Sequence, residues 1–526
     1  MNRGFSTIEL LLAMAIAICV MSVVLIAGGD YLTSGVQTAI GVNQTIVTDS
    51  EISAEALHMA QDLIEDAAAT ARTNYSAVSE SSNPVTVGGV IYTESLSIPI
   101  AFKTQCSQTV VSTVSWTGTH NRNLYVTAET SIVNVPEMVM SGGTCNVSPP
   151  TGGWNPPETY TCARTPSTVA PTALDVFEKI IYLSSDAAPY LHIADANGAP
   201  YNPSCNNALN VQFLSFTNGF TAGRKVNDVR VVRADDDRMY AFLAVTVPTP
   251  PPAVPPPTNQ FRVIDVTNPQ APFQIVAKGL SNIIGGSQPH GFRLFYYDKK
   301  VFLVTKETLG PELHVFDVAT PWIPGSVDEI GSGYELNRTV ESLVITKKLH
   351  SGVDHYYAFM ASDVDWQEVT VLDMTFPTAS TLAVTEITAP DHDLPDPSGG
   401  LDGSAVYLVG DRLYVGRLDG TGPLAAYSDL YVFDASTPWA GLANIAESDV
   451  IGGVIGIVAS GRFAFLSTLE NSQDFKVWRS DPTNLTPIST TFNFPNNAIP
   501  NAARFDGSWV YLAVDSNDVV RILRST

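Results

Sequence analysis

The chain has 526 residues, with 28 Lys and Arg against 52 Asp and Glu and a formal net charge of -24. Proteins that bind nucleic acids, or anionic membranes through polybasic patches, need clustered positive charge, so this balance argues against both classes. Apolar residues make up 45% of the chain, whereas 37 Gly and 35 Pro interrupt regular helices. Since sustained helical periodicity ends near residue 80, we predict a mainly β protein of two to four domains.

The N-terminus contains a long apolar run. Between Phe5 and Ala27 the only ionisable side chain apart from Cys19 is Glu9. At about 1.5 Å per residue this run forms a helix roughly 35 Å long, which is enough to cross a bilayer. It is too long for the apolar core of a signal peptide, and its flank does not fit one. We predict a transmembrane helix over about residues 5–28.

The first residues carry a specific motif. The stretch Arg3-Gly4-Phe5-Ser6-Thr7-Ile8-Glu9-Leu10 resembles the processing site of type IV pilins and pseudopilins. The resemblance implies that residues 1–4 are a leader, that a prepilin peptidase cuts between Gly4 and Phe5, and that Phe5 is then N-methylated. It also implies that Glu9 pairs with the N-terminal amine of a neighbouring subunit, which suits a carboxylate that lacks a partner in lipid. The alternative is an ordinary signal anchor with a stray Glu.

We expect the helix to extend from residue 5 to about residue 75. The segment from Tyr31 to Ala71 contains no Pro and has apolar residues at helical spacing. In pilins this half of the helix packs on the sheet of the head, although a simple amphipathic stalk predicts the same pattern. The expected apolar stripe consists of Ile52, Leu57, Met59, Ala60, Leu63 and Ile64.

Two short segments separate this helix from the rest of the chain. Residues 76–150 contain short β-runs, one of which is Ile98–Phe102, and turn residues separate these runs. We predict that this segment forms a small pilin-like β head. Residues 151–171 are rich in Pro and Gly and are predicted to be a linker or a wrapped connection.

The remainder, residues 172–526, repeats itself. Its unit is an apolar strand that ends in Asp and is followed by a turn with Pro, as in FRVIDVTNPQAP from Phe261 to Pro272. Seven copies occur, and another apolar strand precedes each of them. The shared Asp positions are Asp195, Asp265, Asp317, Asp373 and Asp434, with Arg479 and Arg524 in the last two copies.

Four strands per repeat of roughly 45 to 70 residues are typical of a β-propeller blade. The repeat resembles the LVIVD family of surface-protein propeller repeats, which implies a seven-bladed β-propeller, and a β-sandwich array is the alternative. The chain stops before a fourth strand of the seventh copy. We expect Glu158 to Thr165, ahead of the first blade, to supply the closing outer strand. We interpret Val247–Asn259 as a polyproline II loop that serves as a spacer, and a binding arm is the alternative.

Cysteines and acidic residues suggest two further features. If the body of the protein is exported, Cys106, Cys145, Cys162 and Cys205 can form two disulfides with three possible connectivities. The acidic loop with Asp391, Asp393 and Asp396 offers carboxylates for Ca²⁺. It lacks the spacing of an EF-hand, so we expect a solvated loop and no cofactor.

The sequence contains none of the common catalytic motifs, and we expect that the protein is not an enzyme. The repeated Asp recurs once per blade, which favours a role as a backbone hydrogen-bond acceptor in the following turn. Trp322 and Trp439 occupy the same place in two blades, and we expect them to pack between neighbouring blades rather than to line a binding face.

Together these patterns predict a mainly β protein with a long N-terminal helix, in which a pilin-like α+β module precedes a seven-bladed propeller. The expected role is a type IV pilus or pseudopilus subunit that displays the propeller outside the cell for adhesion to a glycan or protein. Its partners would be other pilin subunits, prepilin peptidase and, before assembly, the inner or cytoplasmic membrane. The alternatives are a major structural subunit with a decorating propeller and an exported propeller enzyme.

Overall fold

The computed structural model describes residues 39–526 and their side chains from residue 51 onward, with gaps. The gaps are 74, 101–102, 105, 119–120, 144, 146–149, 166–168, 206–209, 217–223, 247–258, 283–290, 307–309, 324, 364–366, 379, 389–393, 395–401, 419–426, 471–473, 482, 495–498 and 517. The leader, the predicted transmembrane segment, Gly4, Phe5 and Glu9 therefore lie outside the described residues. None of the helices within the described part is long and apolar enough to span a membrane.

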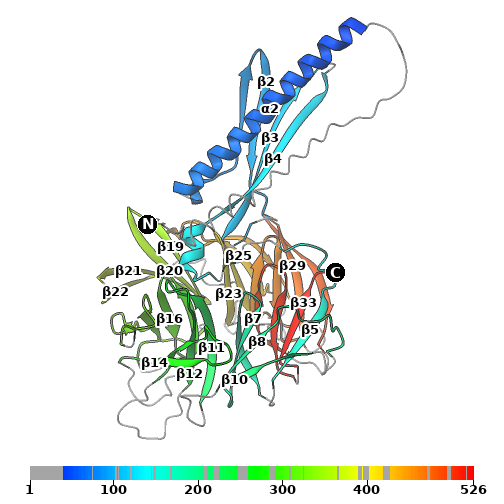
Figure 1. Cartoon of the computed structure of the whole chain (residues 1–526). Coiled ribbons are helices and arrows are strands. Elements are labelled where there is room, and N and C mark those ends of the chain that lie inside the picture. Colours follow the sequence, from blue (N-terminus) through cyan, green and yellow to red (C-terminus); the bar gives the residue numbers. More distant parts are fainter. Residues whose placement is uncertain are drawn as a thin grey trace, which may run out of the picture. The chain divides into compact units, whose positions relative to one another are not determined.

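The described chain is mainly β and divides into two compact units, Met1–Asn134 and Val135–Thr526. In the first unit a helix, α2, is followed by a short 3-10 turn, η1, and an antiparallel sheet in the order β1-β2-β3-β4 (Figure 1). The elements are α2 (Ala39–Thr73), η1 (Tyr75–Ala77), β1 (Ser81–Val87), β2 (Val90–Ser97), β3 (Ser107–Thr117) and β4 (Asn123–Val133).

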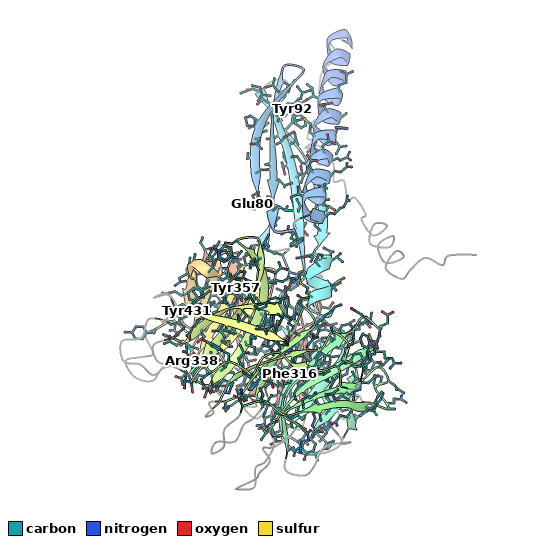
Figure 2. All side chains as sticks on the ribbon, turned by 90° about the vertical axis from the view of Figure 1, so that its left-hand side faces the viewer. Glu80, Tyr92, Phe316, Arg338, Tyr357 and Tyr431 are labelled. Carbon is teal, nitrogen blue, oxygen red and sulfur yellow. A yellow bond between two sulfur atoms is a disulfide. The ribbon has the colours of Figure 1, made fainter. Side chains whose placement is uncertain are left out.

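Helix α2 packs on this sheet through the apolar stripe expected from the sequence. Ala56, Met59 and Ala60 are buried against Tyr92 (labelled in Figure 2) and Trp116, which stand on neighbouring strands. The other stripe residues, Ile52, Leu57, Leu63 and Ile64, are partly buried against the same cluster. The sheet gives the helix an apolar surface, which a simple stalk would not have.

One expected strand of this unit is absent. Ile98 and Pro99 lie outside any strand, and Ile100 forms part of a turn. Pro99 has no backbone N–H to donate to a neighbouring strand, which is why an apolar run alone did not make a strand here. Residues 101–102 are not described.

The second unit contains seven further sheets, numbered here as blades 1 to 7 in chain order (Figure 1). It also contains the short helices α3 (Val135–Met140) and η6 (Pro438–Ala440). Blade 1 has β6 (Pro171–Phe177), β7 (Ile180–Ser185), β8 (Leu191–Asp195) and β10 (Leu214–Phe216); blade 2 has β11 (Lys225–Arg233), β12 (Met239–Thr246), β13 (Phe261–Asp265) and β14 (Phe273–Lys278); blade 3 has β15 (Arg293–Tyr297), β16 (Lys300–Val304), β17 (Leu313–Asp317) and β18 (Asp328–Glu329); blade 4 has β19 (Val340–His350), β20 (Val353–Ser362), β21 (Val369–Thr378) and β22 (Thr381–Ile387).

The later blades follow the same plan. Blade 5 has β23 (Gly403–Val409), β24 (Arg412–Arg417), β25 (Leu430–Asp434) and β26 (Ala443–Ser448); blade 6 has β27 (Gly456–Ser460), β28 (Phe463–Ser467), β29 (Phe475–Asp481) and β30 (Asn484–Phe492); blade 7 has β31 (Pro500–Phe505), β32 (Val510–Val514), β33 (Val520–Arg524), β5 (Glu158–Arg164) and β9 (Val211–Gln212). Each predicted copy of the repeat is the third strand of one blade. The prediction of a mainly β chain built from repeated four-stranded sheets is confirmed.

The blades form a closed ring. The first strand of each blade contacts the first strand of the next blade, in the order β6, β11, β15, β19, β23, β27 and β31. The last of these, β31, contacts β6 and closes the ring. Seven hydrophobic clusters accompany these contacts, each shared by two neighbouring blades. Because both faces of a blade are apolar, a neighbour on each side is needed to bury them, and a ring provides one for every blade. This is a propeller-like fold.

The ring closes through a strand that precedes blade 1 in the chain. As expected from the sequence, β5 pairs antiparallel with β33, the last strand of the chain. Residues 151–171 were predicted to be a linker or a wrapped connection, and the linker alternative is wrong for β5, which lies within that range and pairs with blade 7. Trp154 also lies there and is buried between blades 6 and 7, against Phe465 and Phe505. The Pro and Gly content of this segment predicted an irregular backbone, but it did not predict that part of the segment is buried.

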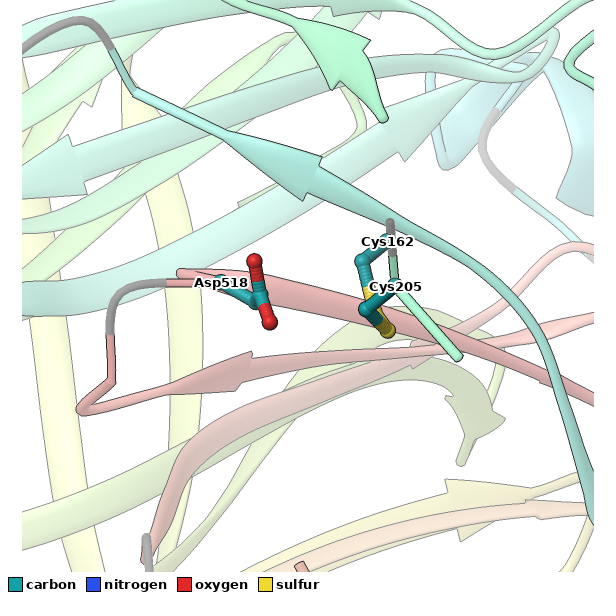
Figure 3. Close-up of side chains that lie close together, drawn as sticks. All are labelled: Cys162, Cys205 and Asp518. Atoms are coloured by element: carbon teal, nitrogen blue, oxygen red, sulfur yellow. A yellow bond between two sulfur atoms is a disulfide. The ribbon is translucent and has the colours of Figure 1, made fainter. Parts of the chain in front are cut away.

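A disulfide holds the closing strand. Cys162 of β5 is bonded to Cys205, in a segment that follows β8, with Cα atoms 5.3 Å apart (Figure 3). Asp518 lies beside this bond. The other two candidates, Cys106 and Cys145, are also disulfide-bonded.

We predict that replacing Cys162 and Cys205 together by Ser lowers the free energy of unfolding of the second unit by about 2–5 kcal/mol, because the unfolded chain loses a cross-link. Urea denaturation followed by tryptophan fluorescence measures this, with Cys19→Ser as the control. An unchanged midpoint in the double variant would contradict the role of the disulfide in closure.

Candidate functional site

A cavity of about 400 Å³ opens where the first strands of the seven blades begin. Every blade contributes to its lining, so it lies on the axis of the ring. We call it the axial pocket. Its lining residues are Ala170, Pro171, Thr172, Asp186, Lys225, Asn227, Phe292, Arg293, Glu341, Asp363, Asp402, Gly403, Ser404, Leu418, Ile455 and Asn501.

A repeated backbone irregularity places polar side chains in this pocket. In five blades the pairing of the first strand with the second shifts by one residue near the start of the strand. The extra residue is polar in every case and lines the pocket. These residues are Thr172, Asn227, Glu341, Ser404 and Asn501. Bulges of this kind redirect a side chain, and here they direct five toward the axis.

Four of the five bulge residues have a structural role. Each donates a side-chain hydrogen bond to a backbone carbonyl of the next blade around the ring, which ties neighbouring blades together. Asn501 donates to Pro171 at 2.9 Å and Asn227 donates to Gly291 at 2.5 Å. Thr172 and Ser404 donate in the same way to Val226 and Val454.

Glu341 is the exception among these residues. Its ionised carboxylate cannot donate a hydrogen bond to the next blade. Instead, its Oε1 lies 3.7 Å from Lys306 Nζ, and its side chain is 30% exposed. The position that is used elsewhere to join blades is thus occupied by an acid that faces the pocket, which makes Glu341 the best candidate for a ligand contact.

The pocket carries more acid than base. Its lining includes the carboxylates of Asp186, Glu341, Asp363 and Asp402, against the cations Lys225 and Arg293. Carboxylates accept hydrogen bonds from hydroxyl and ammonium groups. The described lining contains neither His nor Cys, so it offers no Ser–His or Cys–His pair for nucleophilic catalysis.

A buried charged cluster joins the first strands of blades 1, 2 and 7. Asp175 Oδ1 accepts a hydrogen bond from Arg504 Nε at 3.1 Å and lies 3.9 Å from Arg230 Nη1. Its Oδ2 accepts one from the Val231 N–H at 2.7 Å. Burial raises the pKa of Asp175 to about 6, because desolvation outweighs the attraction of Arg230. Burial also raises the pKa of Tyr407 to about 12.

The chain enters this unit at the other end of the first strands. The Met140 carbonyl, at the end of α3, accepts a hydrogen bond from the Asp298 N–H, in the turn after β15. Tyr297 donates to Glu137 of α3 at 2.6 Å. Burial raises the pKa of Glu137, which Tyr297 and the nearby lysines partly counteract. The axial pocket is therefore at the end of the ring opposite to the entry of the chain.

The structure describes only some of the residues that the sequence indicated as candidates. Asp391, Asp393 and Asp396 lie outside the described residues, as does most of the polyproline loop. Asp195, Asp265, Asp317 and Asp434 each accept a hydrogen bond from the backbone N–H two residues later, at 2.8–2.9 Å, as expected. Trp322 and Trp439 pack between blades, on Tyr240 and His350 respectively.

The axial pocket could not be predicted from the sequence. A signal was present, because each bulge residue is a polar residue at the second or third position of the first strand of its blade. A polar residue at a strand boundary is common, however, and only the register shifts distinguish these five.

Comparisons with known proteins add little. No protein-family model and no curated protein matches the chain. Among solved structures, it is similar to a chain of the mitotic checkpoint complex (12% identity, 71% of this chain and 90% of that chain, TM-score 0.40) and to the C-terminal WD40 domain of Sif2 (9%, 71% and 97%, 0.37). It is also similar to an α-L-arabinanase of Penicillium chrysogenum (12%, 56% and 91%, 0.33). These similarities carry no argument about activity, and the fold assignment rests on the sheets described above.

Asp175 generates a pH prediction. Because its pKa is raised in the folded protein, its stabilising contribution is fully present below the ordinary pKa of 3.8 and is lost as the pH rises through about 6. Relative to Asp175→Asn, the free energy of unfolding should fall by up to about 3 kcal/mol between about pH 4 and pH 7.

Urea denaturation of both proteins across this pH range measures the difference. Only the change of this difference with pH is informative, because the substitution also alters contacts that do not depend on the protonation of Asp175. A difference between the two proteins that stays constant with pH would contradict the raised pKa.

Proposed function

We propose that this chain is a type IV pilin-like or pseudopilin-like subunit whose propeller-like unit binds an extracellular, hydroxyl-rich ligand, such as a glycan, in the axial pocket. The N-terminal helix would anchor the chain in the membrane before assembly and join it to other subunits afterwards. The observation that carries the binding role is Glu341, because it gives up the inter-blade hydrogen bond of its counterparts and faces the pocket.

Three features support the proposal. The motif from Arg3 to Leu10 resembles a prepilin processing site, and α2 packs on a four-stranded antiparallel sheet as in a pilin head. The pocket opens at the end of the ring opposite to α3, through which the chain enters this unit. Its acidic, hydrogen-bonding lining suits hydroxyl groups better than anions.

The binding role predicts a defined effect of Glu341→Gln. Loss of one charge-assisted hydrogen bond should weaken binding of the selected glycan by about 10-fold or more without changing the melting temperature. A glycan array with the full chain would select the ligand, and calorimetry would measure its affinity. Glu129→Gln, an exposed change in the first unit, is the matched control. Equal affinity of native protein and Glu341→Gln would contradict the assignment of the pocket.

The assembly role predicts a separate effect of Glu9→Val. The variant should still insert into the membrane but should be absent from filaments, because the N-terminal amine of its neighbour loses its carboxylate partner. Immunogold labelling of filaments and membrane fractionation measure the two steps, with Ser6→Ala as the control. Normal incorporation of Glu9→Val would contradict the pilin-like role, and labelling along the whole filament would favour the alternative of a major structural subunit.

A further inference from the structure

Two histidines and one aspartate meet at the end of blade 4 that faces away from the axial pocket. His350 is the last residue of β19, His355 lies on β20, and Asp373 lies on β21. One ligand atom from each, a ring nitrogen or a carboxylate oxygen, lies within 4.8 Å of the other two. The Nδ1 atom of His355 is 2.7 Å from Asp373 Oδ1.

Asp373 is free of the turn role that its counterparts have. In blades 1, 2, 3 and 5 the repeated Asp ends its strand and accepts the N–H of the following turn. In blade 4 the strand β21 continues past Asp373 to Thr378, so the turn comes later. The carboxylate of Asp373 is directed instead to His355 and to Tyr357, whose hydroxyl is 3.4 Å from Oδ2.

Neighbouring aromatic residues hold the second histidine in place. The His350 ring stacks on Trp439 of blade 5, with ring centroids 4.4 Å apart and planes inclined by 12°. The hydroxyl of Tyr357 (labelled in Figure 2) is also 3.4 Å from His350 Nδ1. A hydroxyl between a histidine and a carboxylate is the kind of outer contact that orients metal ligands.

The composition and exposure of the cluster fit a transition metal. Two imidazoles and one carboxylate are ligands that suit Zn²⁺ and related divalent ions, and hard cations such as Ca²⁺ prefer oxygen ligands alone. Ligand atoms that share Zn²⁺ at about 2.0–2.1 Å lie roughly 3–3.5 Å apart, so small side-chain rotations are sufficient. Side chains of His355 and Asp373 are 20% and 18% exposed, so a water molecule has access to a fourth position.

We propose that His350, His355 and Asp373 form a binding site for a divalent transition-metal ion of the Zn²⁺ type, with water completing the coordination. The metal replaces the hydrogen bond between His355 and Asp373, and Tyr357 and Trp439 orient the ligands. The site shares no residue with the axial pocket and lies at the other end of the first strands.

The test uses the full chain, purified in detergent without a histidine tag and with its disulfides intact. Oxidising conditions matter because reduced Cys162 and Cys205, beside Asp518, would offer a second group of ligands. Calorimetry with Zn²⁺ should give one site per chain, and Co²⁺ should give a visible absorption band that Zn²⁺ removes. Absence of saturable binding would overturn the proposal.

Substitutions locate the site. His355→Gln and Asp373→Asn should each weaken Zn²⁺ binding by about 10-fold or more. His350→Gln should have the same effect while leaving the hydrogen bond between His355 and Asp373 in place, so it separates loss of a ligand from loss of local structure. The control is His58→Gln, because His58 pairs with Asp62 at 3.0 Å without a third ligand among the described residues.

Melting temperatures without metal show whether each variant is folded. Native affinity in His350→Gln, or an equal loss in His58→Gln, would overturn the assignment to these three residues.

Discussion

Backbone pairing between β5 and β33 is the contact on which the second unit depends. Each blade has two apolar faces, and a linear row of blades would leave one face exposed at each end. The chain avoids this by placing β5, which precedes blade 1, beside the last strand of blade 7. The disulfide from Cys162 to Cys205 and the burial of Trp154 hold the same junction. A short segment that resembles a linker thus completes the ring.

Ring closure also creates the axial pocket. Bulges at the start of five first strands turn polar side chains toward the axis, and four of these side chains join one blade to the next. The hydrogen bonds satisfy polar groups and fix the spacing of the blades. Glu341 occupies the equivalent position without such a bond. Comparison of equivalent positions among the blades therefore distinguishes Glu341, the proposed ligand contact, from the four structural residues.

A similar comparison explains the cluster at His350, His355 and Asp373. The repeated Asp is a turn residue wherever its strand ends at that point, and in blade 4 the longer strand removes the turn. The carboxylate of Asp373, which the repeat would use for backbone hydrogen bonding, therefore contacts the side chains of His355 and Tyr357 instead. In both places the proposed binding site rests on the departure of one blade from its repeat, not on the repeat itself.

Local patterns of apolar and turn residues were sufficient to predict the repeat, the third strand of each blade, the closing strand and the apolar stripe of α2. They also predicted the acceptor role of Asp195, Asp265, Asp317 and Asp434, which depends on residues only two positions away, but not the different contacts of Asp373. Which residues line the axis, and which surround His350, depends on contacts between blades. Glu341 and Asn501, or His350 and Trp439, are far apart in the chain, and their proximity follows from strand register and ring closure, which a local pattern does not encode.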